Sequence, residues 1–515
     1  MSYKYIKSRT LNLVFVGLVL GSICCGGCSS RTENQKKRPN ILLLMSDNHS
    51  WNHLGCYGDP VVKTPNIDSL ARQGIRFTNA FCAAPSCTPA RASMLTGMDI
   101  WKLEEGANLW GTISSKFQVF TDMLEESGYL VGFQGKGWGP GNYEAGGWER
   151  NPAGDQYETF QAFLNQREKG QPFTYWFSSR NPHRPYSDNA TKVDIDLASI
   201  KVPSYLPDND SVRMDMADYY AEIQSFDNEV GTFLKLLEES GDMENTLIIV
   251  CSDNGWQMPR GLANLYTFGT KIPMIISMPD RFKGGRVIAD FVGLSDLAPT
   301  FLELADIPVP KEMTAKSMVN ILASKGDGTI EPDRDFMVTA RERHAFVRNG
   351  GAGYGGRSII TKGYLYIRNY EPEQWPAGDP PLYGDVDAHM LHYPSPTKEY
   401  MLRYREKEGV KELFDLAFEK RPAEELFDLR TDPDQLNNVA NQAEYQNTKE
   451  MLSKKLEAYL SSTGDPRVIG GEMKWLGAQY FSERDKRPTP SIISQEVFGL
   501  KESYSYVEDS VKQDK

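Results

Sequence analysis

Short, almost entirely apolar runs that alternate with helical patterns constrain the fold of this 515-residue chain more than any other feature. The runs at 40–45 (NILLLM) and 246–251 (TLIIVC) show no alternation of apolar and polar residues. Such runs are typical of strands that are buried on both faces of a parallel sheet. The segments 129–133 (YLVGF) and 272–276 (IPMII) predict two further strands of the same kind.

Helical patterns separate these strands. Thr64-Pro65 predicts the start of a helix that runs through Ala71 and closes at Gly74, by the logic of an N-cap, a first-turn proline and a C-cap. A second helix is expected over 119–127. Apolar residues recur every three or four positions from 216 to 237, which predicts a long amphipathic helix. The alternation predicts the α/β class, with a mostly parallel sheet sandwiched by helices.

The chain is too long for one core of ordinary size, so more than one domain is expected. We predict a larger N-terminal domain over 38–325 and a smaller C-terminal α+β subdomain over 326–465. The smaller part contains short strand patterns near 357–360 and 364–368, and a helical pattern at 447–461. Residues 466–515 show no interpretable period and are assigned as a C-terminal extension.

The N-terminus has the pattern of an export signal over 1–28, followed by a polar tether over 29–37. Three basic residues precede an apolar stretch at 11–23 that is too short to span a bilayer. Gly27-Cys28 before two serines resembles a bacterial lipobox, which implies lipidation of Cys28. Position −3 relative to Cys28 is Cys25 instead of the usual aliphatic residue. The alternative is therefore simple cleavage of the signal and release of the protein without a lipid. We expect an exported protein in the periplasm or outer membrane, attached to the membrane only by this lipid.

The net charge of −12 argues against nonspecific binding to nucleic acid, and any polyanionic ligand must be met by a local basic pocket. Seven cysteines occur, and three of them lie in the N-terminal signal. The other four are Cys56, Cys82, Cys87 and Cys251, which are too widely spaced for a disulfide framework or a Cys-x-x-Cys zinc site.

Two pairs of Asx residues follow two of the predicted strands. Asp47-Asn48 comes directly after the first run, and Asp253-Asn254 follows the run that ends at Cys251. The carboxyl ends of parallel strands meet at one edge of a sheet, where ligands gather. Hard oxygen ligands suit Ca²⁺ or Mg²⁺. Either pair alone is more often the start of a turn, but both pairs, in one chain with the motif described next, predict a metal site.

Residues 87–91 read Cys-Thr-Pro-Ala-Arg, a Cys-x-Pro-x-Arg pattern. A lone cysteine is more often a buried small apolar residue than a nucleophile. This pattern, however, resembles the site at which sulfatases convert a cysteine to formylglycine. The order of further motifs is also similar to that of type I sulfatases: RPNI at 38–41, TPNID at 64–68, FTNAF at 77–81, GK at 135–136, SDNG at 252–255 and ELFDL at 425–429.

The resemblance runs from about residue 38 to 465 and implies an alkaline-phosphatase-like fold with Ca²⁺ as the cofactor, Mg²⁺ being the less favoured ion. The implied metal ligands are Asp47, Asn48, Cys87, Asp253 and Asn254. The implied catalytic residues are Cys87 as the formylglycine nucleophile, Arg91 and Lys136 as charge-balancing groups, and His183 as the general acid.

Substrate contacts are expected from Arg184, Arg260, Arg343, His344 and Arg357, whose cationic or imidazole groups can bind sugar carboxylates or sulfates. The alternative for the charged run at 341–344 is a solvated surface. Two positions depart from the family pattern. Trp138 stands where many sulfatases have a histidine, and Leu262 stands where they have a sulfate-binding Lys or Arg.

The stretch 252–270 is most similar to heparan N-sulfatases, which implies hydrolysis of the N-sulfate of glucosamine in heparin or heparan sulfate. The expected partners are this sulfated glycan and a formylglycine-generating maturase. An O-sulfatase of another sulfated carbohydrate is the first alternative, and a catalytically degenerate glycan-binding lipoprotein is the second. A related metal-dependent phosphohydrolase is less favoured, because such enzymes usually present Ser or Thr as the nucleophile.

Overall fold

A computed structural model describes residues 37–187, 195–385, 395–490, 492–501 and 504–507. Residues 38–515 form one compact unit. The predicted export signal, Cys28 and all but the last residue of the predicted tether lie outside the described residues. Within the described part of the chain, every helix is too short or too polar to cross a membrane.

The larger sheet has eight strands in the order β4-β3-β5-β1-β6-β7-β2-β8. Its strands are β1 (Asn40–Ser46), β2 (Ile75–Phe81), β3 (Leu130–Gly135), β4 (Asp155–Gln156), β5 (Phe173–Ser178), β6 (Thr246–Ser252), β7 (Lys271–Ser277) and β8 (Arg286–Gly293). Every neighbouring pair is parallel except the two pairs that contain β7. The mostly parallel sheet is thus confirmed, with one antiparallel strand that its apolar run could not reveal.

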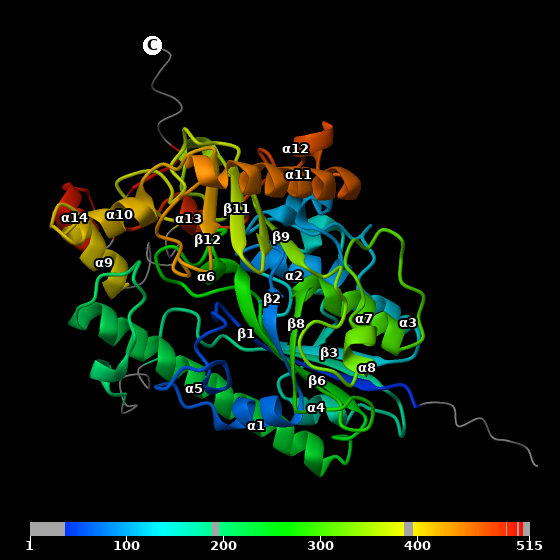
Figure 1. The fold of residues 1–515 in the computed structure, drawn as a ribbon. Helices are drawn as coiled ribbons and strands as arrows, with labels where there is room; N and C mark the ends of the chain where they lie inside the picture. Colours follow the sequence, from blue (N-terminus) through cyan, green and yellow to red (C-terminus); the bar gives the residue numbers. More distant parts are fainter. Residues whose placement is uncertain (1–36, 188–194, 386–394, 491, 502–503, 508–515) are drawn as a thin grey trace, which may run out of the picture. The chain divides into compact units, whose positions relative to one another are not determined.

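Helices cover both faces of this sheet (Figure 1). One layer contains α2 (Cys87–Thr96), α3 (Phe120–Glu126), α7 (Leu297–Leu304) and α8 (Val319–Ala323). The other layer contains α1 (Pro65–Gln73), α4 (Phe160–Leu164), α5 (Asp210–Glu239), α9 (Pro396–Arg403) and α10 (Lys411–Phe418). Alternate residues of β1 enter the two cores: Ile41, Leu43 and Met45 on one side, and Leu42 and Leu44 on the other. A strand buried on both faces needs apolar residues at every position, which explains the continuous run.

Helix α1 begins at Pro65 as predicted, but its ends differ from the expected caps. The Thr64 side chain makes no capping bond to the helix backbone; its hydroxyl donates to Asp68 Oδ1 at 3.1 Å. Gly74 follows the helix with φ −103°, outside the left-handed region. A Cβ at Gly74 would lie 2.7 Å from the carbonyl oxygen of Ile276 in β7. Close approach to the sheet therefore requires this glycine, not a left-handed cap.

A second sheet, of four antiparallel strands, lies beside β2 and β8 (Figure 1). Its strands are β9 (Phe336–Arg341), β10 (Gly356–Thr361), β11 (Tyr364–Asn369) and β12 (Glu424–Asp428). Leucines of α11 (Gln446–Thr463) pack on one face of it, and Phe81, Tyr266 and Phe291 from the larger sheet and its loops pack on the other. The predicted smaller subdomain thus contains an antiparallel sheet and a covering helix. The boundary predicted near residue 325 lies between α8 and β9.

The remaining helices are short: α6 (Thr267–Thr270), α12 (Pro466–Ile469), α13 (Glu483–Lys486) and α14 (Ile492–Phe498). Three of them belong to the C-terminal extension. Although the extension shows no helical period, it contains the buried aromatic residues Trp475, Tyr480 and Tyr506. These side chains anchor it to the rest of the folded unit.

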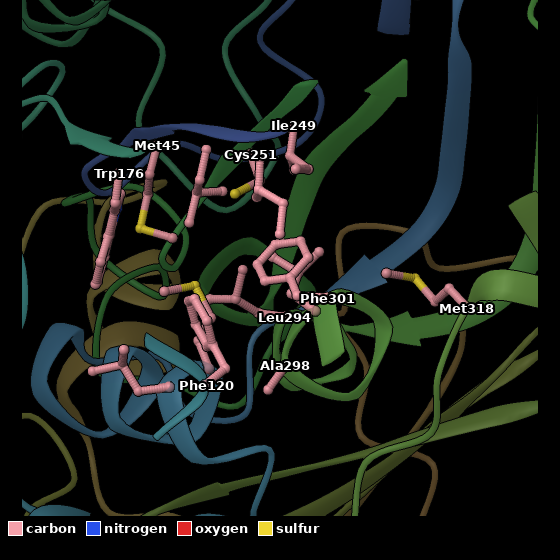
Figure 2. Packing of buried hydrophobic residues seen from close by; sticks show 14 of the residues in the cluster. Met45, Phe120, Trp176, Ile249, Cys251, Leu294, Ala298, Phe301 and Met318 are labelled. Carbon is pink, nitrogen blue, oxygen red and sulfur yellow. The ribbon is translucent and has the colours of Figure 1, made fainter. Parts of the chain in front are cut away.

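The core between β1, β6 and the α3–α7 layer is built around large side chains (Figure 2). Phe301 of α7 is fully buried, and its ring meets Phe120 edge to face with centroids 5.1 Å apart. Phe301→Ala is expected to lower the free energy of unfolding by about 3–5 kcal/mol, because it leaves a cavity as well as losing apolar burial. Denaturant unfolding followed by tryptophan fluorescence measures this loss.

Met451→Ala is the control for that substitution. Met451 lies on α11 and is 57% exposed, so its truncation should change stability by no more than about 0.5 kcal/mol. Equal losses for the two variants would contradict the assignment of Phe301 to the packed core.

Candidate active site and metal centre

The carboxyl ends of five strands meet at one edge of the larger sheet. Strands β1, β6, β3, β5 and β2 all run in the same direction. The segments that follow them carry Asp47 and Asn48, Asp253 and Asn254, Lys136, His183, and Cys87 respectively. Residues that are far apart in the sequence are therefore brought together by strand direction alone.

Cys87 is the first residue of α2 and is buried. Its Sγ lies 3.4 Å from Asp47 Oδ1 and 3.7 Å from Asn48 Oδ1, and it accepts a hydrogen bond from Asn254 Nδ2 at 3.7 Å. Both predicted Asx pairs thus contact the thiol of the Cys-x-Pro-x-Arg motif. One turn along α2, Arg91 faces the same cluster, because residues four apart share a helix face.

Two cations balance the two carboxylates. Arg91 Nε donates to Asp253 Oδ2 at 2.9 Å, and Lys136 Nζ donates to Asp47 Oδ2 at 2.7 Å. Arg91 Nη2 also lies 3.6 Å from Asp47 Oδ2, while its Nη1 donates to Ser178 Oγ and to the carbonyl oxygen of Gly137. The four charges therefore sum to zero. A bound divalent cation would make the cluster net positive and attractive to a sulfate group.

The donor set fits a hard cation. Ligand atoms of Asp47, Cys87 and Asp253 all lie within 4.8 Å of one another. The buried Oδ1 of Asn254 has no hydrogen-bond partner among the described residues, although buried acceptors are normally satisfied. Asn48 has φ +62°, a region that asparagine tolerates, and its backbone N–H donates to Asp253 Oδ1. Carboxylate and amide oxygens together suit Ca²⁺ or Mg²⁺.

Burial shifts the pKa values of the cluster. Burial, reinforced by the charges of Asp253 and Asp47, raises the pKa of the Cys87 thiol well above its usual range. Burial alone would raise the pKa of Asp47, but the charges of Lys136 and Arg91 outweigh it and lower that pKa. Burial and the Asp47 charge raise the pKa of Asp253. Without a metal, the thiol is protonated at neutral pH and is a poor nucleophile.

A cavity of about 670 Å³ opens over this cluster. Asp47, Cys87 and Lys136 line it together with His183, Arg184 and His344. Arg184 forms an ion pair with the buried Asp215 at 2.7 Å. His344 Nδ1 lies 2.9 Å from Ser86 Oγ, and its buried Nε2 has no hydrogen-bond partner among the described residues. Leu262 also lines the cavity, so an apolar side chain stands where the family pattern has a cation.

His183 lies within reach of the charged cluster. Burial, aided by the Lys136 charge, lowers the pKa of His183 to about 3, and its Nδ1 is hydrogen-bonded to the carbonyl oxygen of Arg184. The ring is therefore neutral in the free protein at neutral pH. An anionic group bound beside it would favour the protonated ring, because opposite charges stabilise each other.

Three of the predicted substrate contacts lie outside the cavity lining. Arg357 is fully buried and pairs with Glu342 and Asp465 at 2.8 and 2.6 Å. Arg343 donates to the carbonyl oxygens of residues 478 and 479. Arg260 donates to the carbonyl oxygens of residues 416 and 435 and stacks on a tyrosine ring. The structure thus does not bring these guanidinium groups to the nucleophile, and Arg260 does not stand in for Leu262.

Trp138 is also absent from the cavity lining and is buried in the hydrophobic core on one face of the larger sheet. Conversely, sequence reasoning did not identify Glu222, Ser482, Arg484 or Asp485, all of which line the cavity. Glu222 lies on the buried side of the amphipathic α5. A charged residue among the apolar positions of a helix is a signal by which the sequence could have identified it. The other three belong to the extension, whose sequence carries no periodic signal.

Comparisons with known proteins identify the family of the chain. A family model described as Sulfatase matches residues 39–307. An ulvan-active sulfatase of Formosa agariphila is 28% identical, over 83% of this chain and 81% of its own. The N-sulphoglucosamine sulphohydrolase of Homo sapiens is 27% identical, over 84% of this chain and 92% of its own.

The fold is similar to that of BT4656, solved in complex with its substrate D-glucosamine-2-N,6-O-disulfate. The TM-score is 0.61 at 20% sequence identity, over 85% of this chain and 100% of that chain. At this identity the likeness shows the fold alone.

Removal of one carboxylate should strongly weaken metal binding. Ca²⁺ at about 100 times its Kd should stabilise the protein by about 2.7 kcal/mol relative to the same protein in EDTA. Asp253→Asn should lose most of this gain, because an amide lacks the charge that holds a hard cation. Differential scanning calorimetry gives the melting temperature in EDTA, in Ca²⁺ and in Mg²⁺. The larger rise above the EDTA value identifies the ion that stabilises the protein more.

The matched control is Asp122→Asn, which changes a partly exposed carboxylate on α3. This variant should keep the full Ca²⁺-dependent rise in melting temperature. An undiminished rise in Asp253→Asn would show that the metal binds elsewhere or that other ligands suffice.

Proposed function

We propose that this chain, which belongs to the sulfatase family, removes the N-sulfate of glucosamine in heparin or heparan sulfate. That it is a sulfatase acting on sulfated glycans follows from the family and its relatives. The observation that carries the site assignment is the contact of Cys87 with both Asx pairs, whose carboxylates are in turn paired with Arg91 and Lys136. The choice of the N-sulfate rests on similarity to the human sulphohydrolase, which spans most of both chains.

The proposed nucleophile is a formylglycine, made from Cys87 by a maturase. One hydroxyl of its hydrate passes its proton to the Asp253 carboxylate as its oxygen attacks the sulfur atom, the S–N bond breaks, and the sugar amine leaves with a proton donated by His183. The second hydroxyl then passes its proton to the neutral His183, the aldehyde reforms, sulfate leaves from the residue, and Asp253 releases its proton to solvent. Water restores the hydrate.

The neighbouring residues supply charge and orientation. Lys136, which lines the cavity, and Arg91, which is buried beside it, both lie against Asp47 and would offset the charge of the sulfate oxygens. Asp47, Asn48, Asp253 and Asn254 would hold Ca²⁺ together with the modified residue. A bound Ca²⁺ would polarise a sulfate oxygen and make sulfur more electrophilic. His183 would acquire its proton only when the anionic substrate is present, which couples acid catalysis to binding.

Hydrolysis of an O-sulfate in another glycan is the second candidate. Its support is the similarity to ulvan-active sulfatases, which is as extensive as that to the human enzyme. The cavity leaves the choice open, because both substrates present the same sulfate group to the same charged cluster.

Sulfate release from a small panel of sugars tests the bond. We expect sulfate from glucosamine N-sulfate and none from 6-O-sulfated N-acetylglucosamine or ulvan oligosaccharides. Cys87→Ala should lower kcat/KM at least about 1,000-fold, because the covalent step is lost. Cys56→Ala changes a cysteine outside the cavity and should keep full activity. Release from the O-sulfated sugars alone would replace the N-sulfatase assignment with the second candidate.

Mass spectrometry of the peptide that contains Cys87 tests the nucleophile. After expression with a competent maturase, the peptide should carry formylglycine. Complete retention of the thiol, together with binding of heparin fragments, would favour a catalytically degenerate glycan-binding protein.

We further propose that the protein is exported and attached to the membrane by lipid on Cys28. The basis is the resemblance of residues 27–30 to a lipobox. Cys28→Ser should move the protein from the membrane fraction to the soluble fraction, whereas Cys24→Ser should leave it in place. Identical fractionation of the two variants would contradict a lipid on Cys28.

A further inference from the structure

The C-terminal extension forms part of the catalytic cavity. Ser482, Arg484 and Asp485, from α13 and the residue before it, line the same cavity as Cys87 and Lys136. These residues lie almost 400 positions after the nucleophile in the chain. Nothing in the family resemblance, which ends near 465, assigns a role to them.

Specific contacts hold this segment in place. Arg343 donates to the carbonyl oxygens of Ala478 and Gln479 at 2.7 and 3.2 Å, and its guanidinium lies over the ring of Tyr480. The hydroxyl of Tyr480, which is 2% exposed, donates to Asp485 Oδ2 at 2.6 Å. The segment is therefore fixed on both sides of Ser482 by buried or charged groups. Arg343, predicted to contact substrate, instead anchors the wall of the cavity.

The same segment supports Trp110, another residue of the cavity lining. The backbone N–H of Phe481 donates to the carbonyl oxygen of Trp110 at 2.9 Å. Asn108 Nδ2 donates to the carbonyl oxygen of Trp475 at 2.8 Å. Trp110 has φ +52°, a conformation that a bulky side chain adopts only when its surroundings enforce it. The extension thus helps to hold an indole ring in the cavity wall.

The charges of the cavity are divided between two regions. Lys136 pairs with Asp47 in the nucleophile cluster, and Arg184 pairs with Asp215. Two further arginines of the lining are exposed: Arg180 after β5, and Arg484 on the short helix α13 at the cavity wall beside Trp110. A sulfated glycan carries further carboxylates or sulfates besides the group that is cleaved. A guanidinium at the wall is suited to such a group, because its planar fork binds carboxylate or sulfate oxygens in pairs.

We propose that Trp110 and Arg484 form a substrate subsite, in which the indole packs on the sugar and Arg484 binds a second anionic group of the glycan. This inference rests on the proposed function, since it concerns the same cavity and the same class of substrate. The extension would then determine specificity, because the protein would prefer sugars that carry a second anionic group besides the sulfate that is cleaved.

The test compares three sugars: glucosamine N-sulfate, glucosamine 2-N,6-O-disulfate, and glucosamine N-sulfate linked to a uronic acid. Arg484→Gln should raise KM about 3- to 10-fold for one or both of the sugars with a second anion, the range for a partly exposed charge-assisted pair. KM for glucosamine N-sulfate and kcat for all three should stay unchanged. Which of the two larger sugars responds identifies the second group as sulfate or carboxylate.

Two further variants make the result specific. Arg487→Gln removes an exposed arginine of the same segment that lies outside the cavity lining, and it should leave all KM values unchanged. Arg484→Lys keeps the positive charge but not the planar guanidinium. For the sugars with a second anion, its KM should lie between those of the unmodified protein and Arg484→Gln. Equal KM changes for all three sugars, or no change for any, would overturn the subsite.

Direct binding separates this proposal from the proposed function. Calorimetric Kd values for the same sugars are measured on Cys87→Ala with and without Arg484→Gln. If glucosamine N-sulfate is not hydrolysed, but Arg484→Gln still weakens binding of the doubly anionic sugars, the proposed reaction is wrong and the subsite stands. Kd values that do not depend on Arg484 would refute the subsite, whatever the reaction.

Discussion

The buried charge network of Arg91, Asp253, Asp47 and Lys136 is the interaction on which the rest of the site depends. It joins α2 to the ends of β1, β6 and β3 through contacts of 2.7–3.6 Å. A buried charge without a partner is very costly, so these four groups fix one another in position. The position of Cys87 follows, because it lies one helical turn from Arg91 and in contact with Asp47. Loss of any one partner would leave an unbalanced charge beneath the cavity.

The fold provides the network through strand direction. Five strands point their carboxyl ends at the same edge, and the residues that follow them meet there without any long-range sequence signal. The antiparallel β7 does not disturb this arrangement, since it carries none of the site residues. Neutrality of the four charges has a functional consequence. A divalent cation would add net positive charge, which a sulfate group would then offset.

The outer part of the cavity is built differently from its floor. The floor comes from the larger sheet, whereas the wall includes His344 from the loop after β9 and Ser482, Arg484 and Asp485 from the extension. Buried arginines mediate these attachments: Arg357 ties residue 465 to the second sheet, and Arg343 ties residues 478 and 479 to the loop after β9. If the proposed subsite is right, chemistry and substrate choice lie on separate structural layers, and changes in the wall could adapt one reaction to different glycans.

The sequence by itself determined the strands at 40–45 and 246–251, the long helix ending near residue 240, and the nucleophile motif with its Asx pairs. These features are local, because burial on both faces and helical period leave their trace in neighbouring residues. Only the tertiary structure decided that β7 is antiparallel, that Arg260, Arg343 and Arg357 bind protein groups, and that Arg484 reaches the cavity. An arginine looks the same in sequence whether its partner is a buried carboxylate, a carbonyl oxygen or a substrate, since that partner is chosen by packing between segments hundreds of residues apart.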